Sequence, residues 1–250
     1  MKYIDINCDM GESPGGISSV DQQIMPLVTS SNIACGFHAG DALQIEETIK
    51  LGVEHNTQLG AHPGYPDKEG FGRNNLDLPH NELTAIIKYQ LAAILGVAES
   101  LGAAITYVKL HGALYNQAAT QVDIASGCLE AIGSINPKLK VVGPAESTLE
   151  NLCKSNGFAF IAEAFADRMY ESTGYLRSRS LPQAVITDPS TACEQALDII
   201  NHQQATAFDG TKVPLPANTI CIHGDNPNAV EILRALDRAF KQHGITKKSF

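Results

Sequence analysis

Four histidines each stand at the end of a short apolar run, and imidazole groups can transfer protons near neutral pH or bind divalent metals. They are His38, His62, His111 and His223. A single histidine in such a place more often caps a strand or bonds a loop carbonyl. Four at equivalent positions favour a shared site, because ligands gather at the carboxyl ends of strands in parallel α/β proteins. The pattern predicts an enzyme.

Acidic and amide side chains accompany these histidines. Asp5, Asn7 and Asp9 alternate with apolar residues in the first run, so all three point to one face of a strand. Asp41 and Asp225 lie at corresponding places in later units. A set of histidines and aspartates can relay protons or bind a metal, and the sequence leaves both open.

Several common motifs are absent. No G-x-x-x-x-G-K-[ST] or G-x-G-x-x-G nucleotide loop occurs, and no G-x-S-x-G nucleophile turn. Neither H-E-x-x-H nor H-x-x-x-H occurs, so a bound metal would need ligands from distant strands. The candidate metal ligands are Asp5, His38 and His62.

Lys109 lies two residues before His111, and therefore on the same face of its strand. A lysine that faces a barrel interior is costly unless it is paired. Two roles are open for it. Lys109 either holds a substrate carboxylate or phosphate, or forms a salt bridge to Asp5 or Glu163.

Two long stretches, 64–79 and 165–191, are rich in glycine, proline and charge. Loops of that length in a compact domain are usually lids or binding loops. Their arginines suit carboxylate or phosphate recognition. The candidates are Arg73, Arg168 and Arg179, whereas Arg177 is expected to be solvated.

Strand-like runs alternate with helical stretches, which predicts a parallel sheet with right-handed crossovers. Seven units in 250 residues suit a closed or nearly closed barrel, although an open doubly wound sheet also fits. Strands are expected at 3–8, 32–36, 57–61, 105–110, 139–143, 158–163 and 219–223. The clearest helices are expected at 41–51, 82–101, 191–201 and 229–243.

The composition sets limits on the class of protein. With 250 residues and 44% apolar content, the chain suffices for a single α/β domain spanning 1–250. A net charge of −9 argues against nucleic acid or an anionic membrane as partner. No segment reaches the roughly 20 apolar residues of a membrane span, and the start lacks a signal-peptide core. Six cysteines without C-x-x-C spacing indicate free thiols, so we expect a cytoplasmic protein.

Seven motifs run from the first strand to the last. In chain order they are Asp5-Ile-Asn-Cys-Asp-Met-Gly-Glu12, Asn32-Ile-Ala-Cys-Gly-Phe-His-Ala-Gly-Asp41, Gly60-Ala-His-Pro-Gly-Tyr-Pro-Asp67, Gly70-Phe-Gly-Arg73, His111-Gly-Ala-Leu-Tyr-Asn116, Phe165-Ala-Asp-Arg168 and His223-Gly-Asp-Asn-Pro227. Together they resemble the LamB/YcsF family over essentially the whole chain. Seven motifs in the right order make a highly specific signal.

That family is the A component of the bacterial ATP-dependent 5-oxoprolinase. The resemblance implies a seven-stranded parallel (β/α) barrel of the glycoside hydrolase/deacetylase type. It also implies opening of 5-oxoproline to L-glutamate, coupled to hydrolysis of ATP to ADP and phosphate, with ATP and Mg²⁺ as co-substrate. The implied partners are 5-oxoprolinase subunits B and C, and a homo-oligomer is open.

The resemblance carries site residues over to this chain. The expected catalytic residues are Asp5, Asp9, His38, His62, His111 and His223. The expected substrate-binding residues are Asn7, Glu12, Arg73, Lys109, Glu163, Arg168 and Arg179. Asp41, Asp167 and Asp225 also match family motifs. Two positions depart from the family pattern: Leu110 replaces a usual proline, and Asn74 replaces a frequent second arginine, which weakens a two-arginine phosphate clamp.

Two rival functions remain open. A metal-dependent deacetylase or amidohydrolase that acts without ATP would keep the fold and change the reaction. A protein that only binds 5-oxoproline and presents it to catalytic partners belongs to a different class. For that binding protein, His62→Ala or Asp9→Ala should abolish binding, whereas an enzyme allows variants that bind yet fail to turn over.

Overall fold

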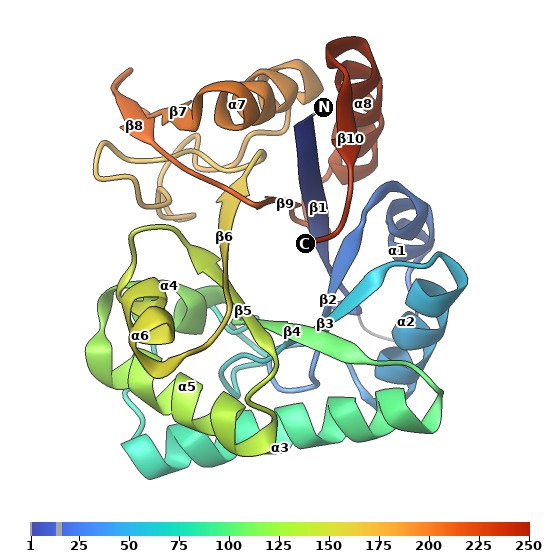
Figure 1. Ribbon diagram of the computed structural model, residues 1–250, viewed down its shortest axis with the longest axis vertical. Coiled ribbons are helices and arrows are strands. Elements are labelled where there is room, and N and C mark those ends of the chain that lie inside the picture. Colours follow the sequence, from blue (N-terminus) through green and yellow to red (C-terminus); the bar gives the residue numbers. More distant parts are fainter. Residues whose placement is uncertain (1, 14–16) are drawn as a thin grey trace.

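Seven parallel strands close into a barrel in the computed structural model, which describes residues 2–13 and 17–250 (Figure 1). In order around the barrel they are β1 (Lys2–Met10), β2 (Ser30–Ala34), β3 (Gln58–His62), β4 (Ile105–Lys109), β5 (Lys140–Pro144), β6 (Phe160–Phe165) and β9 (Thr219–Ile222). Strand β9 pairs with both β6 and β1, and the second pairing closes the sheet. The seven predicted strands and the barrel are confirmed, and the open doubly wound sheet is wrong.

Helices surround the barrel. They are α1 (Ser19–Ile24), the 3₁₀ turn η1 (Met25–Leu27), α2 (Ala42–Glu54), α3 (His80–Ser100), α4 (Gly112–Thr120), α5 (Val122–Ile135), α6 (Thr148–Asn156), α7 (Pro189–His202) and α8 (Ala229–His243). The four helices placed from the sequence are confirmed as α2, α3, α7 and α8. Three short strands were not anticipated: β7 (Gln204–Thr206) and β8 (Lys212–Pro214) form a hairpin, and β10 (Ile245–Lys247) pairs with the start of β1.

The long helix α3 is amphipathic. Leu83, Ile87, Leu91 and Ile94 are buried along one face at helical spacing. The helix packs along α5 at the lower edge of the view in Figure 1. Among the described residues, α3 alone is long and apolar enough to cross a membrane, a test that core helices of soluble proteins also pass. One face of α3 is buried against its neighbours in the fold.

A polar network fills the barrel interior. Asp5, Asn7 and Asp9 are buried, and they hydrogen-bond side chains of other barrel strands, as the alternation in β1 predicted. One aromatic ring joins this network: the Tyr107 hydroxyl donates to Asn32 Oδ1 at 2.7 Å. That ring lies against Gly60, where a Cβ atom would approach it to 2.2 Å. A glycine is therefore required at position 60 of β3.

Candidate active site

A cavity of about 800 Å³ opens at the carboxyl ends of the strands. Asp9, Lys109 and Glu163 line it from β1, β4 and β6. The other predicted site residues along its walls are His62, Arg73, His111, Arg168, Arg179 and His223. Loops 63–79 and 166–188 supply the arginines, as expected from their length and charge. The structure therefore brings most of the predicted residues to one place.

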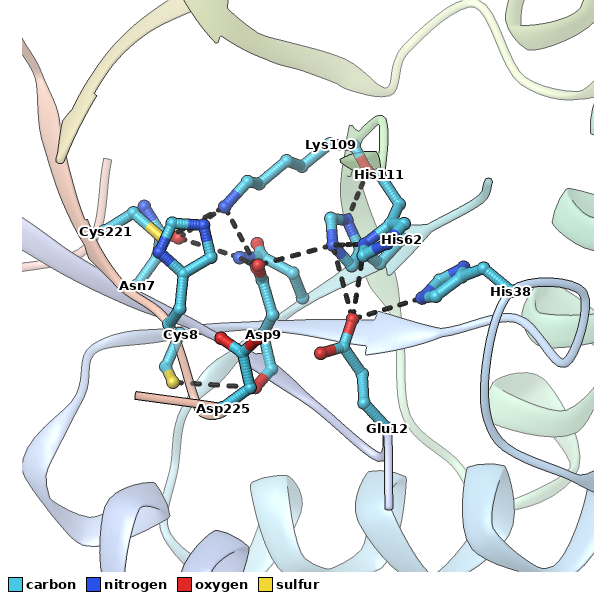
Figure 2. A network of polar contacts seen from close by, with 12 residues as sticks. Asn7, Cys8, Asp9, Glu12, His38, His62, Lys109, His111, Cys221 and Asp225 are labelled. Carbon is cyan, nitrogen blue, oxygen red and sulfur yellow. Dashed lines mark hydrogen bonds and ion pairs between the residues drawn. The ribbon is translucent and has the colours of Figure 1, made fainter. Parts of the chain in front are cut away.

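Lys109 is buried between two carboxylates. Its Nζ lies 2.9 Å from Asp9 Oδ1 and 3.0 Å from Glu163 Oε1, and it donates to Cys221 Sγ at 3.1 Å (Figure 2). Burial alone would lower the pKa of Lys109, but Asp9, Cys221 and Glu163 together raise it well above its usual range. Lys109 is therefore a cation. The predicted salt bridge to Glu163 is confirmed, and the one to Asp5 is wrong.

Asp9 is held as a carboxylate. Burial would raise its pKa, yet the charges of His62 and Lys109 keep the pKa of Asp9 well below its ordinary value. Its Oδ2 lies 3.5 Å from His62 Nε2, and its Oδ1 accepts from Asn32 at 2.7 Å. Asp9 thus connects the Lys109 pair to the neighbouring histidines.

Asp5 does not reach the cavity. Its carboxylate accepts hydrogen bonds from the hydroxyls of Thr29 and Ser30, both at 2.6 Å, and from that of Thr219. Burial raises the pKa of Asp5. The predicted metal set, which joined Asp5 to two histidines, is therefore corrected: Asp5 bonds hydroxyl groups deeper in the barrel, and Glu12 supplies the carboxylate beside the histidines.

Glu12, His38, His62 and His111 converge beside the cavity, and His62 and His111 line it (Figure 2). Glu12 Oε1 lies 3.1 Å from His38 Nε2, 3.3 Å from His111 Nδ1 and 3.8 Å from His62 Nε2. Although burial opposes ionisation, the contacts with His111 and His38 lower the pKa of Glu12 well below its usual value. Three of the four histidines expected to share a site therefore do so, and Glu12 links them.

His38 packs flat against His111. Their ring centroids lie 3.7 Å apart with an interplanar angle of 3°. Burial lowers the pKa of His38 to about 3, so its ring is neutral. Two glycines make room for the pair: a Cβ atom at Gly64 would lie 2.7 Å from His38 Nδ1, and one at Gly72 would lie 2.7 Å from both the His111 ring and His38 Cβ. These glycines explain why motif residues of the first long loop surround the histidines.

His223 stands apart from the other three histidines. Its Nδ1 lies 3.0 Å from Asp167 Oδ1, and its ring stacks on Phe165 with centroids 5.2 Å apart. Burial opposes ionisation of Asp167, but His223 lowers the pKa of that carboxyl below its ordinary value. A ring nitrogen of His223, a carboxylate oxygen of Asp9 and the sulfur of Cys221 lie within 4.8 Å of one another. His223 thus faces Asp9 across the cavity.

Arginines from both long loops meet at Asp225. Arg179 Nη1 lies 3.0 Å from Asp225 Oδ2, and Arg73 Nη2 bonds the same oxygen. The guanidinium of Arg73 also lies 4.7 Å above the Phe71 ring. Arg168 is buried nearby, and burial, followed by repulsion from Arg179, lowers its pKa to about 10. Three cationic side chains therefore line the cavity, and two of them pair with Asp225.

Two other expectations need correction. Arg177 is not a solvated side chain, because it pairs with Glu171 at 2.6 Å and its guanidinium lies 3.7 Å from the centre of the Phe208 ring. These two contacts of Arg177 stabilise the loop that carries Arg179. Asp41 caps helix α2, since its carboxylate accepts from the Gln44 backbone N–H at 2.9 Å.

Sequence reasoning missed two residues at the cavity. Tyr115 lines it, and its buried hydroxyl has no hydrogen-bond partner among the described residues. Its place in the motif that begins at His111 was the available signal. Cys221 was interpreted only as a buried strand thiol; it is buried, but it also contacts Lys109. The free thiols expected from the cysteine spacing are confirmed.

Known proteins resemble this chain over its full length. It is 45% identical over 251 residues to a protein of Pseudomonas syringae pv. tomato that is named as a 5-oxoprolinase A subunit, a match that covers 100% of this chain and 98% of that protein. It is 42% identical to the 5-oxoprolinase A subunit of Staphylococcus carnosus, with 97% of each covered.

Solved structures give the same picture. The lactam utilization protein of Thermus thermophilus is 38% identical and superposes with a TM-score of 0.92 over 100% of both chains. The catalytic domain of a peptidoglycan N-acetylglucosamine deacetylase from Eubacterium rectale shares the fold at 8% identity, with a TM-score of 0.54 over 100% of this chain and 88% of that one. The model of the LamB/YcsF family matches residues 4–250. The chain therefore belongs to the LamB/YcsF family.

Proposed function

We propose that this chain is the A component of a 5-oxoprolinase, which opens the lactam ring of 5-oxoproline to give L-glutamate while ATP is hydrolysed to ADP and phosphate. Relatives at 42–45% identity are named as that component, and the Thermus thermophilus relative is named for lactam utilization. Because those names describe one component of a larger enzyme, they support action in a complex. Subunits B and C are the partners we propose, and Mg²⁺ enters bound to ATP.

The observation that carries this proposal is a pair of unsatisfied polar atoms at the cavity. Glu163 Oε2 and the Tyr115 hydroxyl are buried and have no hydrogen-bond partner among the described residues. The two groups are neighbours that interact, since burial, then the charge of Glu163 and then hydrogen bonding with it raise the pKa of Tyr115, although their atoms do not meet the geometry of a full hydrogen bond. Buried polar atoms are normally paired, so these two can serve a ligand. A lactam presents one N–H donor beside one C=O acceptor: Glu163 can accept from the N–H, and Tyr115 can donate to the carbonyl.

Ring opening moves two protons. Water adds to the carbonyl carbon and loses a proton, the C–N bond breaks, and the ring nitrogen gains a proton. We assign these transfers to His223, because Asp167 fixes its Nδ1 at 3.0 Å and its ring lines the cavity. This orientation of an imidazole by a buried carboxylate is typical of general acid–base groups.

The cations hold the anionic groups of the reaction. Lys109, Arg168 and the Arg73–Arg179 pair can bind the substrate carboxylate and a transferred phosphoryl group. A five-membered lactam is an unactivated amide that closes again easily, which gives ATP its role: a phosphoryl group on the amide oxygen would activate the carbon, water would open the ring to an acyl phosphate, and a second water would release phosphate. Because the chain lacks the common nucleotide loops, we expect this coupling to need the partner proteins.

The test is release of glutamate and phosphate from 5-oxoproline and Mg-ATP, with this chain alone and with subunits B and C. We expect equal amounts of both products in the full mixture only. A matched pair of variants in this chain sharpens the assay: Glu163→Gln should abolish turnover, whereas Glu130→Gln, on the outer face of α5, should not change it.

Two outcomes would overturn the proposal. No glutamate from a folded and associated complex would favour a metal-dependent hydrolase that acts without ATP. Unchanged turnover in Glu163→Gln, with 5-oxoproline still bound by this chain, would favour a protein that only presents the substrate.

A further inference from the structure

Two backbone carbonyls fix which nitrogen of His62 and of His111 carries a proton. His62 Nδ1 lies 2.7 Å from the carbonyl oxygen of Lys109, and His111 Nε2 lies 2.8 Å from that of Phe71. A carbonyl oxygen only accepts, so both of these outer nitrogens must donate an N–H. When both rings are neutral, as metal binding requires, the inner nitrogens are therefore His62 Nε2 and His111 Nδ1, each with a lone pair directed into the cluster.

The two inner lone pairs face each other beside a carboxylate. His62 Nε2 and His111 Nδ1 lie 3.1 Å apart, and Glu12 Oε1 lies 3.8 Å and 3.3 Å from them (Figure 2). Three electron-rich atoms at this separation repel one another unless a proton or a metal ion lies among them. Ligands about 2.0–2.1 Å from a tetrahedral metal ion stand about 3.3–3.4 Å from each other, which is the mean separation here.

His38 belongs to the same cluster, but it cannot bind the same ion as His111. Its ring is parallel to that of His111 within 3°, at 3.7 Å, so an ion in the plane of one ring lies outside the plane of the other. Imidazole lone pairs lie in the ring plane, and both rings cannot bind one ion. His38 Nε2 instead bonds Glu12 Oε1 at 3.1 Å and orients it. It is a positioning residue.

We propose that Glu12 Oε1, His62 Nε2 and His111 Nδ1 bind one divalent first-row transition metal ion, with zinc best matched to the donor set. Two imidazoles and one carboxylate, with outer N–H groups held by carbonyls, form the ligand arrangement of catalytic zinc sites. Mg²⁺ and Ca²⁺ prefer oxygen ligands and fit less well. His62 and His111 line the cavity, so the remaining coordination position faces it. A bound ion would act there as a Lewis acid. The site does not depend on the lactam being the substrate.

The experiment measures metal binding to the full chain. Metal-free protein is titrated with Zn²⁺ by calorimetry, and with Co²⁺ by visible absorption, which reports a low coordination number. We expect one ion per chain and a Co²⁺ spectrum that Zn²⁺ abolishes. Glu12→Gln, which keeps the side-chain shape, and His111→Ala should remove stoichiometric binding. His38→Ala should weaken affinity by about 10–100-fold, the usual effect of losing an outer partner.

His80→Ala is the matched control, because His80 pairs with Glu130 at 2.9 Å on the exposed surface. The affinity of His80→Ala for Zn²⁺ and Co²⁺ should equal that of the unaltered chain. If the unaltered chain shows no saturable uptake of either ion, the site is refuted, and the histidine pair instead shares a proton. Equal affinity in Glu12→Gln and the unaltered chain would also refute it. Circular dichroism shows whether each variant is folded. Metal binding by the unaltered chain tests the site independently of the variants.

Discussion

Replacement of Lys109 by methionine tests the centre of the site most directly. Lys109 has 2% of its surface exposed, and its carboxylate partners Asp9 and Glu163 have 5% and 1%. Little water therefore reaches the ammonium group or its two carboxylate partners. The Lys109→Met variant keeps most of the side-chain volume and leaves two buried carboxylates without their shared cation.

The expected loss of stability follows from the distances between Lys109 and its two carboxylate partners. At about 3 Å and an effective dielectric constant near 20, each ion pair is worth roughly 5 kcal/mol before the cost of desolvation. Removal of one partner of a buried pair typically costs about 3–5 kcal/mol in free energy of unfolding. For a chain of this length, each kcal/mol shifts Tm by about 2–4 °C, so we expect Tm to fall by about 6–20 °C.

The assay is thermal unfolding of four proteins by circular dichroism: the unaltered chain, Lys109→Met, Glu163→Gln and the double variant. Glu163→Gln removes one of the two carboxylates that Lys109→Met leaves unpaired. The loss of unfolding free energy in the double variant should therefore be smaller than the sum of the two single losses by about 0.5–3 kcal/mol. The control is Lys50→Met, whose exposed pair with Glu46 should contribute at most about 0.5 kcal/mol. A fall in Tm below about 2 °C for Lys109→Met, or additive losses, would refute the reasoning.

Three further predictions concern other parts of the molecule. His223→Ala should lower turnover by about 10²–10⁴-fold, measured at a temperature at which the variant remains folded, because the ring serves proton transfer; an unchanged rate contradicts this role. Asp167→Asn should destabilise the fold at pH 7. Since the pKa of Asp167 is lowered in the folded chain, its carboxylate stabilises the fold above the unfolded pKa of about 3.9. The difference in Tm from the unaltered chain should therefore shrink as pH falls below about 4, and a constant difference contradicts the assignment. Gly60→Ala should cost about 1–3 kcal/mol through overlap with the Tyr107 ring, whereas Gly96→Ala, in open space on α3, should add about 0.5–1 kcal/mol; equal unfolding curves would refute the packing argument.

The barrel could be predicted from the sequence because its signals are local. Each of its strands is an apolar run, and α3 repeats apolar residues at helical spacing, so neither needs knowledge of distant contacts. The short strands β7, β8 and β10 escaped prediction for the opposite reason. Each has three residues, and its pairing partner, not its own composition, makes it a strand.

The sequence by itself determined which residues gather at the carboxyl ends of the strands, and its motifs identified the family. Only the tertiary structure decided which of these side chains pair with one another. It placed Glu12 rather than Asp5 beside the histidines, and it separated His223 from His62. The physical reason is strand register: side-chain alternation in one strand gives the face a residue occupies, but its depth in the barrel depends on hydrogen bonds to neighbouring strands. Those bonds join residues far apart in the chain, and no local pattern reports them.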